Sequence, residues 1–190
     1  NGLFGSGGGT IVVPALNIVM KAEVHKSHAT SIAVILPLTI VSATIYVLSG
    51  ITDWPLTIRV GTGSIVGGLI GALLLNKIKS GLAAGIIGGM GIGGGTILIP
   101  LLTIFQNVNQ HTAQSINLLT FIPMAAVALV IHLKQKNVII KYLPPLIIGG
   151  IVGSIAGAHI SIALSSVILR KAFSIFLLVM GLYEIFGNKS

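Results

Sequence analysis

The sequence contains two copies of a segment in which three glycines are followed by a threonine and, four residues later, by a proline. The first copy is Gly5–Pro14 and the second, 86 residues later, is Gly91–Pro100. Glycine destabilises a helix interior by about 1 kcal/mol and proline by about 3 kcal/mol, so each copy predicts an interrupted helix. Freed backbone N–H groups at the start of the following helix are suited to binding an anion. The predicted anion-binding residues are Gly7, Gly8, Gly9 and Thr10, and Gly93, Gly94, Gly95 and Thr96.

A pair of polar residues follows each glycine-rich segment. His28 and Ser31 are three residues apart and share a helix face. At the same offset of 86 residues they correspond to Gln114 and Asn117. Polar side chains inside apolar helices often take part in function, so we predict that these four complete one central anion site. Hydrogen bonding between helices, without a ligand, is the alternative interpretation.

Few other side chains in the sequence could take part in catalysis, proton transfer or metal binding. His28 and His159 are candidates for proton coupling because imidazole titrates near neutral pH. The chain has no cysteine, and no Ser-His-Asp set, HExxH motif, paired carboxylates or histidine pair with metal spacing stands out. We therefore expect no enzyme activity, catalytic residue, metal or cofactor. Membrane sites for sodium usually contain carboxylates, and their absence from the apolar segments favours an anionic ligand.

The elements that must position these residues have the composition of membrane spans. Of the 190 residues, 54% are hydrophobic and 7% are charged, whereas soluble domains carry about 25% charged residues. A spanning helix needs about 20 apolar residues, so the sequence predicts an all-α polytopic membrane protein. Charged residues are missing from four long stretches, which are Ser27–Thr52, Val60–Asn76, Ser80–Leu133 and Tyr142–Leu169.

About seven transmembrane segments are expected in a single domain, 1–190. Repeat A is 1–76, repeat B is 77–164, and a C-terminal helix covers 165–190. Because each repeat has three segments, the second copy starts on the opposite side of the membrane, and the repeats are inverted about a pseudo-two-fold axis. The segments run from the start to about Met20 and over about His28–Ser49, Trp54–Leu75, Gly81–Phe105, Thr112–Leu133, Tyr142–Leu164 and Val167–Phe186.

Two glycine stripes support the repeat. The third predicted segment has a glycine at every fourth position, and each of these glycines corresponds to a glycine 86 residues later in the sixth segment. We predict that both stripes allow close helix packing. The stripes are Gly63, Gly67 and Gly71, and Gly149, Gly153 and Gly157.

Basic residues are distributed unevenly between the connections. Eight lie in the connections after segments 1, 3 and 5 and in the C-terminal tail, and three lie on the other side. The positive-inside rule then predicts a cytoplasmic C-terminus for a multi-pass protein. The expected location is a prokaryotic cell (inner) membrane. The rule also explains the net charge of +8 without nucleic acid as a partner.

The motif G-x-G-G-G-x-x-x-x-P-x-L, at Gly5–Leu16 and Gly91–Leu102, resembles that of the TauE/SafE family of membrane proteins, also called the sulfite exporter or TSUP family. The stretches His25–Ser31 and His111–Asn117 are also similar to that family. The resemblance implies a permease for sulfur-containing anions such as sulfite and organosulfonates, with about eight spans in two related halves. This chain departs from that pattern, because no span separates the halves after Gly71 and the helix entering the first glycine segment is short or missing.

These observations predict a secondary transporter for a small anion, a sulfur oxyanion or an organosulfonate, bound where the two interrupted helices meet. Alternating access would come from one repeat rocking against the other. A passive anion channel with the same site and a non-transporting membrane scaffold subunit are the alternatives. The expected partners are the anion and the lipid bilayer, and a homodimer is compatible with the sequence.

Overall fold

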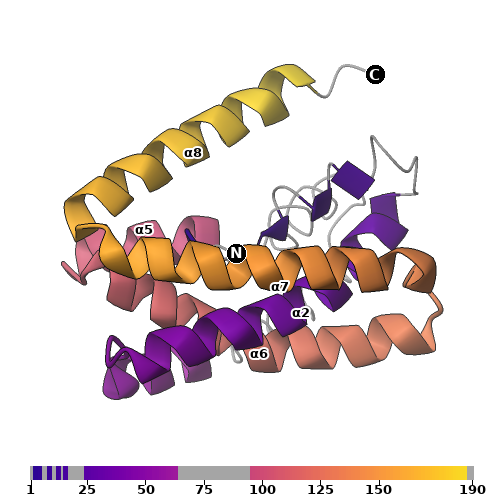
Figure 1. The fold of residues 1–190 in the computed structure, drawn as a ribbon, viewed down its shortest axis with the longest axis horizontal. Helices are drawn as coiled ribbons and strands as arrows, with labels where there is room; N and C mark the ends of the chain where they lie inside the picture. The colour runs from indigo at the N-terminus through magenta and orange to yellow at the C-terminus, as the bar shows by residue number, and fades with distance from the viewer. Residues whose placement is uncertain are drawn as a thin grey trace.

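The computed structural model describes residues 2–5, 8–9, 12–13, 15–16, 24–63 and 95–187, and the long described stretches form a helix bundle (Figure 1). Residues 54–63 are helical, and no β-strand occurs in any of these ranges. The all-helical class expected from the sequence is thus confirmed for the described part of the chain. The named elements are α2 (Val24–Leu48), α5 (Gly95–Phe105), α6 (Gln110–Lys134), the 3₁₀ turn η1 (Ile140–Tyr142), α7 (Leu143–Ala163) and α8 (Ser166–Gly187).

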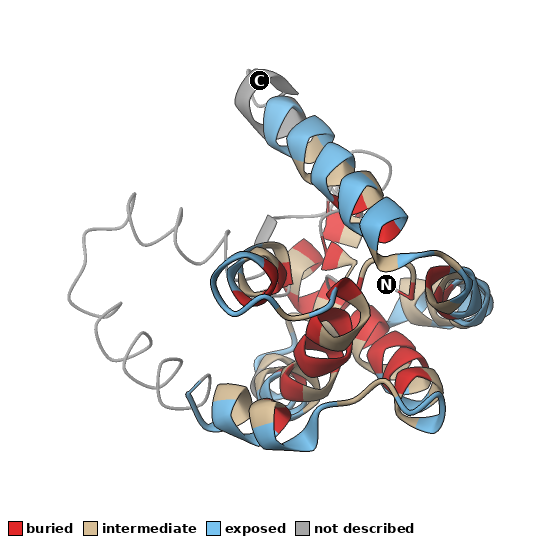
Figure 2. Ribbon diagram, turned by 90° about the vertical axis from the view of Figure 1, so that its left-hand side faces the viewer, coloured by how far each residue is buried: buried red, intermediate tan, exposed pale blue. Residues whose placement is uncertain are grey.

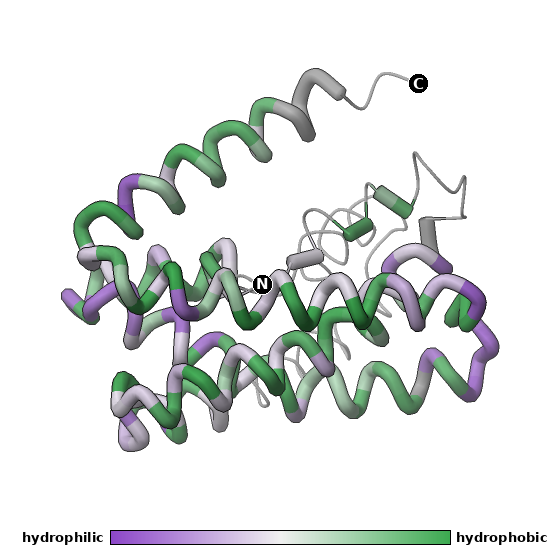
Figure 3. Tube along the Cα trace, viewed as in Figure 1, coloured by the Kyte–Doolittle hydropathy of each residue, from purple (hydrophilic) through white to green (hydrophobic). Residues whose placement is uncertain are grey.

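Three of these elements are long and apolar enough to cross a membrane. They are Lys26–Leu48, Gln110–Lys134 and Ile140–Ala163, and their hydrophobic character is visible along the trace in Figure 3. They coincide with the predicted second, fifth and sixth segments to within a few residues. The prediction of a membrane protein is therefore supported, whereas the count of seven segments involves residues 64–94, outside the described part.

Helix α2 packs along both α6 and α7, and α5 packs on α6. At one end of α2, the backbone N–H of Ile139, just before η1, donates to the Thr30 hydroxyl over 3.0 Å. At the other end, the hydroxyls of Tyr46 and Ser161 lie 2.7 Å apart. These contacts make α2 parallel to α7 and antiparallel to α6, as Figure 1 shows.

The offset of 86 residues is reproduced in local structure. Helix α6 ends 86 residues after α2 ends, and each contains one proline, Pro37 or Pro123, at the equivalent position. Both helices end in the same left-handed turn, at Gly50 with φ 70° and at Lys136 with φ 56°. The backbone hydrogen bonds that close these turns also match, so the same Schellman-type cap follows both helices.

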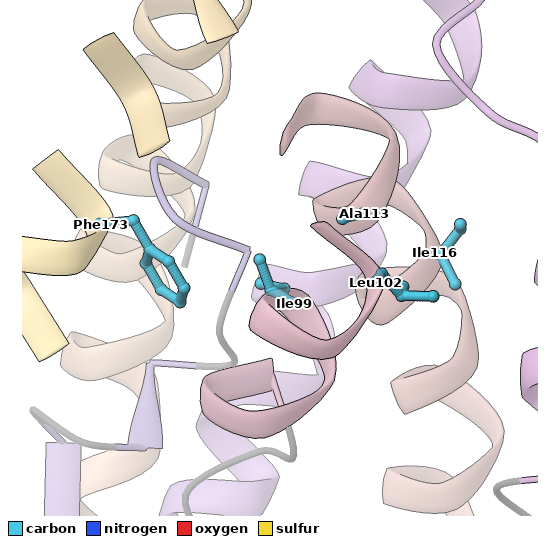
Figure 4. Packing of buried hydrophobic residues seen from close by; sticks show 5 residues of the cluster. All are labelled: Ile99, Leu102, Ala113, Ile116 and Phe173. Carbon is cyan, nitrogen blue, oxygen red and sulfur yellow. The ribbon is translucent and has the colours of Figure 1, made fainter. Parts of the chain in front are cut away.

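The described core consists of two apolar clusters. One joins α5, α6 and α8 through Ile99, Leu102, Ala113, Ile116 and Phe173 (Figure 4). The other joins α2, α6 and α7 through Ala43, Tyr46, Leu118 and Ala158. Buried residues gather where the helices face one another (Figure 2).

Large apolar side chains also cover the outside of the bundle. Leu48, Val127, Ile148 and Ile175 are examples, each more than half exposed. In water such a surface would promote association, whereas in a bilayer it faces acyl chains of the same character. The apolar outer surface is therefore what is expected of helices that span a membrane.

Helix α8 contacts the bundle mainly through its first half. Phe4 lies 5.7 Å from Phe173 and 5.0 Å from Phe176 between ring centroids, which fixes α8 to the N-terminal segment. Beyond these residues α8 diverges from the other helices (Figure 1). It is the predicted seventh segment, but it is not among the three candidate spans.

The second glycine stripe permits close packing at one position rather than along its length. A Cβ on Gly157 would lie 2.8 Å from the Leu3 backbone nitrogen, so the N-terminal segment approaches α7 there. A Cβ on Gly149, Gly153 or Gly63 would meet nothing within 4 Å. This holds for contacts among the described residues, so the packing prediction is confirmed at Gly157 and stays a prediction at these three glycines, while Gly67 and Gly71 lie outside the described residues.

Candidate functional site

The start of the first glycine-rich segment lies against α6. The Asn117 side-chain amide donates to the Gly5 carbonyl over 2.5 Å, and the Gln114 amide donates to the Leu3 carbonyl over 3.5 Å. Gly5 has a φ of 61°, and a Cβ there would lie 2.8 Å from the Gln114 Cβ. Position 5 therefore requires glycine for both its backbone conformation and its space.

The two glycine segments lead into helical residues in the same way. Gly8 has a φ of 68°, and its carbonyl accepts from the Val12 N–H over 3.1 Å, which forms a first helical turn. Gly9 is buried and helical, as is its equivalent Gly95, the first residue of α5. Thr96 follows in α5 and is partly exposed. The predicted site residues Gly7, Thr10, Gly93 and Gly94 lie outside the described residues.

The described part of α5 lies along the first half of α6. It has 11 residues and is thus about 16 Å long. Because only residues 106–109 join the two helices and α5 packs on α6, α5 runs back along α6 from the start of α6. Ile99, one turn into α5, packs in the same cluster as Ile116, and Phe4 packs against that cluster. The first glycine segment and the start of α5 thus approach the same part of α6, around Ile116 and Asn117.

A buried hydrogen-bond network connects α2, α6 and α7 beside this region. The Tyr46 hydroxyl donates to the Gln114 amide oxygen over 2.6 Å, and the Ser161 hydroxyl donates to the same oxygen over 3.2 Å. Tyr46, Gln114 and Ser161 have no exposed surface. The Tyr46 oxygen also lies 3.4 Å from the Gly2 carbonyl, so the network reaches the N-terminal segment.

Tyr46 and Ser161 were not among the predicted site residues. A signal for Tyr46 is present, since it is the one tyrosine in the charge-free stretch 27–52 and a buried tyrosine hydroxyl usually needs a partner. Ser161 has no comparable signal, because serines are frequent in membrane helices as packing residues.

The start of α6 is capped by side chains. Asn109 accepts from the His111 N–H over 3.1 Å and from the Ser166 hydroxyl over 2.8 Å, and Ser166 accepts from the Gln110 N–H over 3.1 Å. The His111 Nε2 atom lies 2.9 Å from the Ser161 carbonyl oxygen. These N–H groups are thus occupied within the protein.

His28 and Ser31 lie away from Gln114 and Asn117. Both pairs are near the start of their helix, and because α2 and α6 are antiparallel, the pairs lie toward opposite ends. Ser31 is buried and donates to the His28 carbonyl over 2.8 Å. The described structure therefore brings Gln114 and Asn117 to the first glycine segment and does not gather the four side chains in one cluster. His159, the other proton-coupling candidate, is exposed on α7.

The family described as Sulfite exporter TauE/SafE matches this chain over residues 1–81 and 78–190. The two matches meet close to the predicted boundary between the repeats at 76 and 77. No matching protein was found among curated sequences, and none among solved structures. Since the two matches together cover every residue and the described helices are apolar enough to span a membrane, this chain belongs to the TauE/SafE sulfite exporter family of membrane transport proteins.

Proposed function

We propose that this chain is a secondary transporter of a small sulfur-containing anion, a sulfur oxyanion or an organosulfonate. The anion binds where the two glycine-rich segments approach α6. The observation that supports this site is the approach of Phe4, Gly5 and Ile99 of α5 to one stretch of α6, around Ile116 and Asn117. Irregular backbone inside a membrane is tolerated only where protein buries it or where it lines a cavity.

Backbone donors supply the affinity in this proposal. They are the N–H groups of Gly7–Thr10 and Gly93–Thr96, with the Thr10 and Thr96 hydroxyls beside them. Gly9 stands at the start of helical residues, where N–H groups have no partner within the helix and the helix dipole favours negative charge. By the repeat, we assign the same role to Gly95, the first described residue of α5. Helices α2, α5, α6 and α7 contain no Asp or Glu, so no carboxylate on these helices competes with an anion.

The polar side chains position the glycine segments and line the site. Asn117 and Gln114 hold the first segment through the Gly5 and Leu3 carbonyls. At the offset of 86 residues, Ser31 and His28 correspond to this pair, and they lie toward the opposite end of α2 from the proposed site.

Transport proceeds by alternating access between two inverted repeats, 1–76 and 77–164. The matching bounds of α2 and α6, their antiparallel packing and their matching caps support this arrangement. Rocking of one repeat against the other would open the site first to one side of the membrane and then to the other. The distribution of basic residues puts the C-terminus in the cytoplasm.

The decisive experiment is anion counterflow in proteoliposomes. Purified protein is first screened by thermal shift against sulfite, sulfate, thiosulfate and sulfonates, with carboxylates as the comparison. A transporter should saturate and exchange labelled anion against unlabelled anion across the membrane. Single-channel currents without counterflow would instead identify a channel, and the absence of both anion binding and flux would identify a scaffold subunit.

A further inference from the structure

We propose that the imidazole of His111 is the proton-binding group of the transporter, and that its proton holds the start of α6 to the end of α7. The protonated ring donates to both of its neighbours, whereas the neutral ring donates to only one of them. Proton binding at His111 follows from the hydrogen-bond geometry, whereas its role in moving the anion rests on the function proposed above.

Both ring nitrogens of His111 face oxygen atoms. Nε2 lies 2.9 Å from the backbone carbonyl oxygen of Ser161, and Nδ1 lies 3.2 Å from the side-chain oxygen of Asn109. A carbonyl oxygen only accepts hydrogen bonds, and a neutral imidazole has a single N–H. One nitrogen of the neutral ring would therefore direct its lone pair at an oxygen, whereas the imidazolium donates to both oxygens.

The orientation of the Asn109 amide is fixed by two other donors. The backbone N–H of His111 donates to the same Asn109 oxygen over 3.1 Å, and the Ser166 hydroxyl donates to it over 2.8 Å. Turning the amide over would place its NH₂ group against a backbone N–H, so the oxygen is the atom that faces Nδ1. Asn109 is thus an acceptor for the imidazole as well as a cap for α6.

The end of α7 also favours a positive charge at this position. Helix α7 ends at Ala163, so the Ser161 carbonyl belongs to its last turn, where the negative end of the helix dipole lies. The same carbonyl accepts from the Leu164 N–H over 3.2 Å, which leaves one lone pair for His111. Because α7 has no basic residue in its last turn, the imidazolium supplies that charge from the neighbouring helix.

Charged and titratable groups near His111 lie on the neighbouring elements, and none pairs with it in the described part of the chain. The connection 106–109 and residues 160–166 carry no charged side chain. The stretch after α2 reaches α6 through the hydroxyls of Thr52 and Ser115, which lie 2.8 Å apart. Exposed charges are screened by water and salt, so they affect the imidazole less than its two direct acceptors do. The exposed groups are Asp53 and Arg59 after α2, His159 on α7, and Arg170 and Lys171 on α8, while the Tyr46 hydroxyl is engaged by Gln114.

Ser161 connects His111 to the proposed anion site. Its carbonyl faces the imidazole, and its hydroxyl donates to the Gln114 oxygen over 3.2 Å. The Gln114 amide in turn donates to the Leu3 carbonyl over 3.5 Å, in the segment that leads to Gly5. Loss of the proton would weaken the attachment of α6 to Ser161 and so alter the network that positions the first glycine segment. His111 is partly exposed, so its proton can exchange with water at this end of the bundle.

Proton binding is tested by the pH dependence of thermal unfolding in detergent. Because the two acceptors favour the imidazolium, the stability that they add is present at acidic pH and is lost as the imidazole titrates between about pH 5 and 8. His111→Gln should remove this loss. Asn109→Asp keeps an acceptor for the same N–H groups and sets a carboxylate beside the ring, so the loss should move upward by about one pH unit or more.

The matched comparison is His159→Gln, which removes an exposed histidine of α7 and should leave the profile of the parent protein. An unchanged profile in His111→Gln, or one that does not move in Asn109→Asp, would overturn proton binding at His111. If His111→Gln does not fold, Asn109→Asp decides alone.

Coupling is measured in proteoliposomes with labelled sulfate and methanesulfonate, which stay ionised over this pH range. An imposed pH gradient should make the parent protein accumulate the anion, and this accumulation should be lost in His111→Gln and kept in His159→Gln. Accumulation that persists in folded His111→Gln, or that is lost in His159→Gln instead, would overturn the role of His111 in transport.

Two further outcomes separate this inference from the proposed function. If the parent protein exchanges anions in counterflow but does not respond to the pH gradient, the proposed function stands and the coupling fails. If thermal unfolding places the proton on His111 but the parent protein moves no anion, the proton-binding site stands and the proposed function fails.

Discussion

The Tyr46 hydroxyl and the Gln114 amide oxygen form a 2.6 Å hydrogen bond between the last turn of α2 and the first turns of α6. Both side chains are fully buried, and Ser161 of α7 joins them, so one polar network connects three apolar helices. Water is absent from the interior of a bilayer, so these groups depend on one another for hydrogen bonding.

Replacing Tyr46 with phenylalanine should destabilise the protein by at least about 1 kcal/mol, because the hydrogen bonds of the hydroxyl with Gln114 and Ser161 are lost while the ring still fills its space. Thermal unfolding in detergent measures the effect. Thr44→Val is the control, since Thr44 is exposed and its hydroxyl bonds only to the Ile40 carbonyl of its own helix. Equal midpoint temperatures of unfolding for the two variants would show that the hydrogen-bond network adds no stability.

Gly5→Ala should disturb the first glycine segment. The left-handed φ of 61° and the 2.8 Å approach to the Gln114 Cβ both oppose a side chain, and we expect a loss of about 1–3 kcal/mol. Gly153→Ala is the matched comparison, because a Cβ there would meet nothing within 4 Å and alanine favours the helix by up to about 1 kcal/mol. The prediction fails if both variants unfold at the same temperature.

Gly8→Ala combined with Gly94→Ala should abolish anion binding. Alanine at Gly8 opposes its φ of 68°, and a Cβ at either position would obstruct the approach of an anion to the backbone N–H groups. The measurement is the thermal shift produced by sulfite and the sulfonates, after circular dichroism has established that the double variant folds. If the folded double variant still binds the anion, the glycine segments are not part of the binding site.

Asn117→Leu should weaken anion binding about tenfold, equivalent to about 1.4 kcal/mol, because the Gly5 carbonyl loses the donor that positions it. Ser31→Ala is the comparison, because Ser31 lies toward the opposite end of α2, and it should leave the affinity unchanged. Titration by thermal shift against the anion found in the screen gives both affinities. An affinity unchanged in Asn117→Leu would mean that the position of Gly5 does not matter to the ligand.

The sequence predicted the long helices well, because absence of charge marks them directly. The expected segments His28–Ser49 and Thr112–Leu133 lie within four residues of the bounds of α2 and α6 at both ends. The expected gathering of His28, Ser31, Gln114 and Asn117 did not emerge, for a physical reason. An offset in sequence shows that residues are equivalent, but equivalent residues near the starts of antiparallel helices lie far apart.

The Tyr46–Gln114–Ser161 network could not be derived from the sequence. It depends on which face of α2 meets α6 and on the register between them, and many apolar side chains of similar size would allow other registers. The approach of Gly2 and Leu3 to Gly157 is likewise a property of the packed bundle. By contrast, the glycine pattern did indicate the special backbone at Gly5 and Gly8, because few other residues adopt a positive φ.

Gly50 and Lys136 adopt the same left-handed conformation at equivalent turns, although only one of them is glycine. A residue with a Cβ is strained there by about 1–2 kcal/mol, so the second half of the protein retains the hand of the turn without the residue that suits it. With the cytoplasmic C-terminus proposed above, Lys136 would add to the positive charge on the cytoplasmic side. The proposed topology would thus account for a lysine at a turn where glycine is less strained.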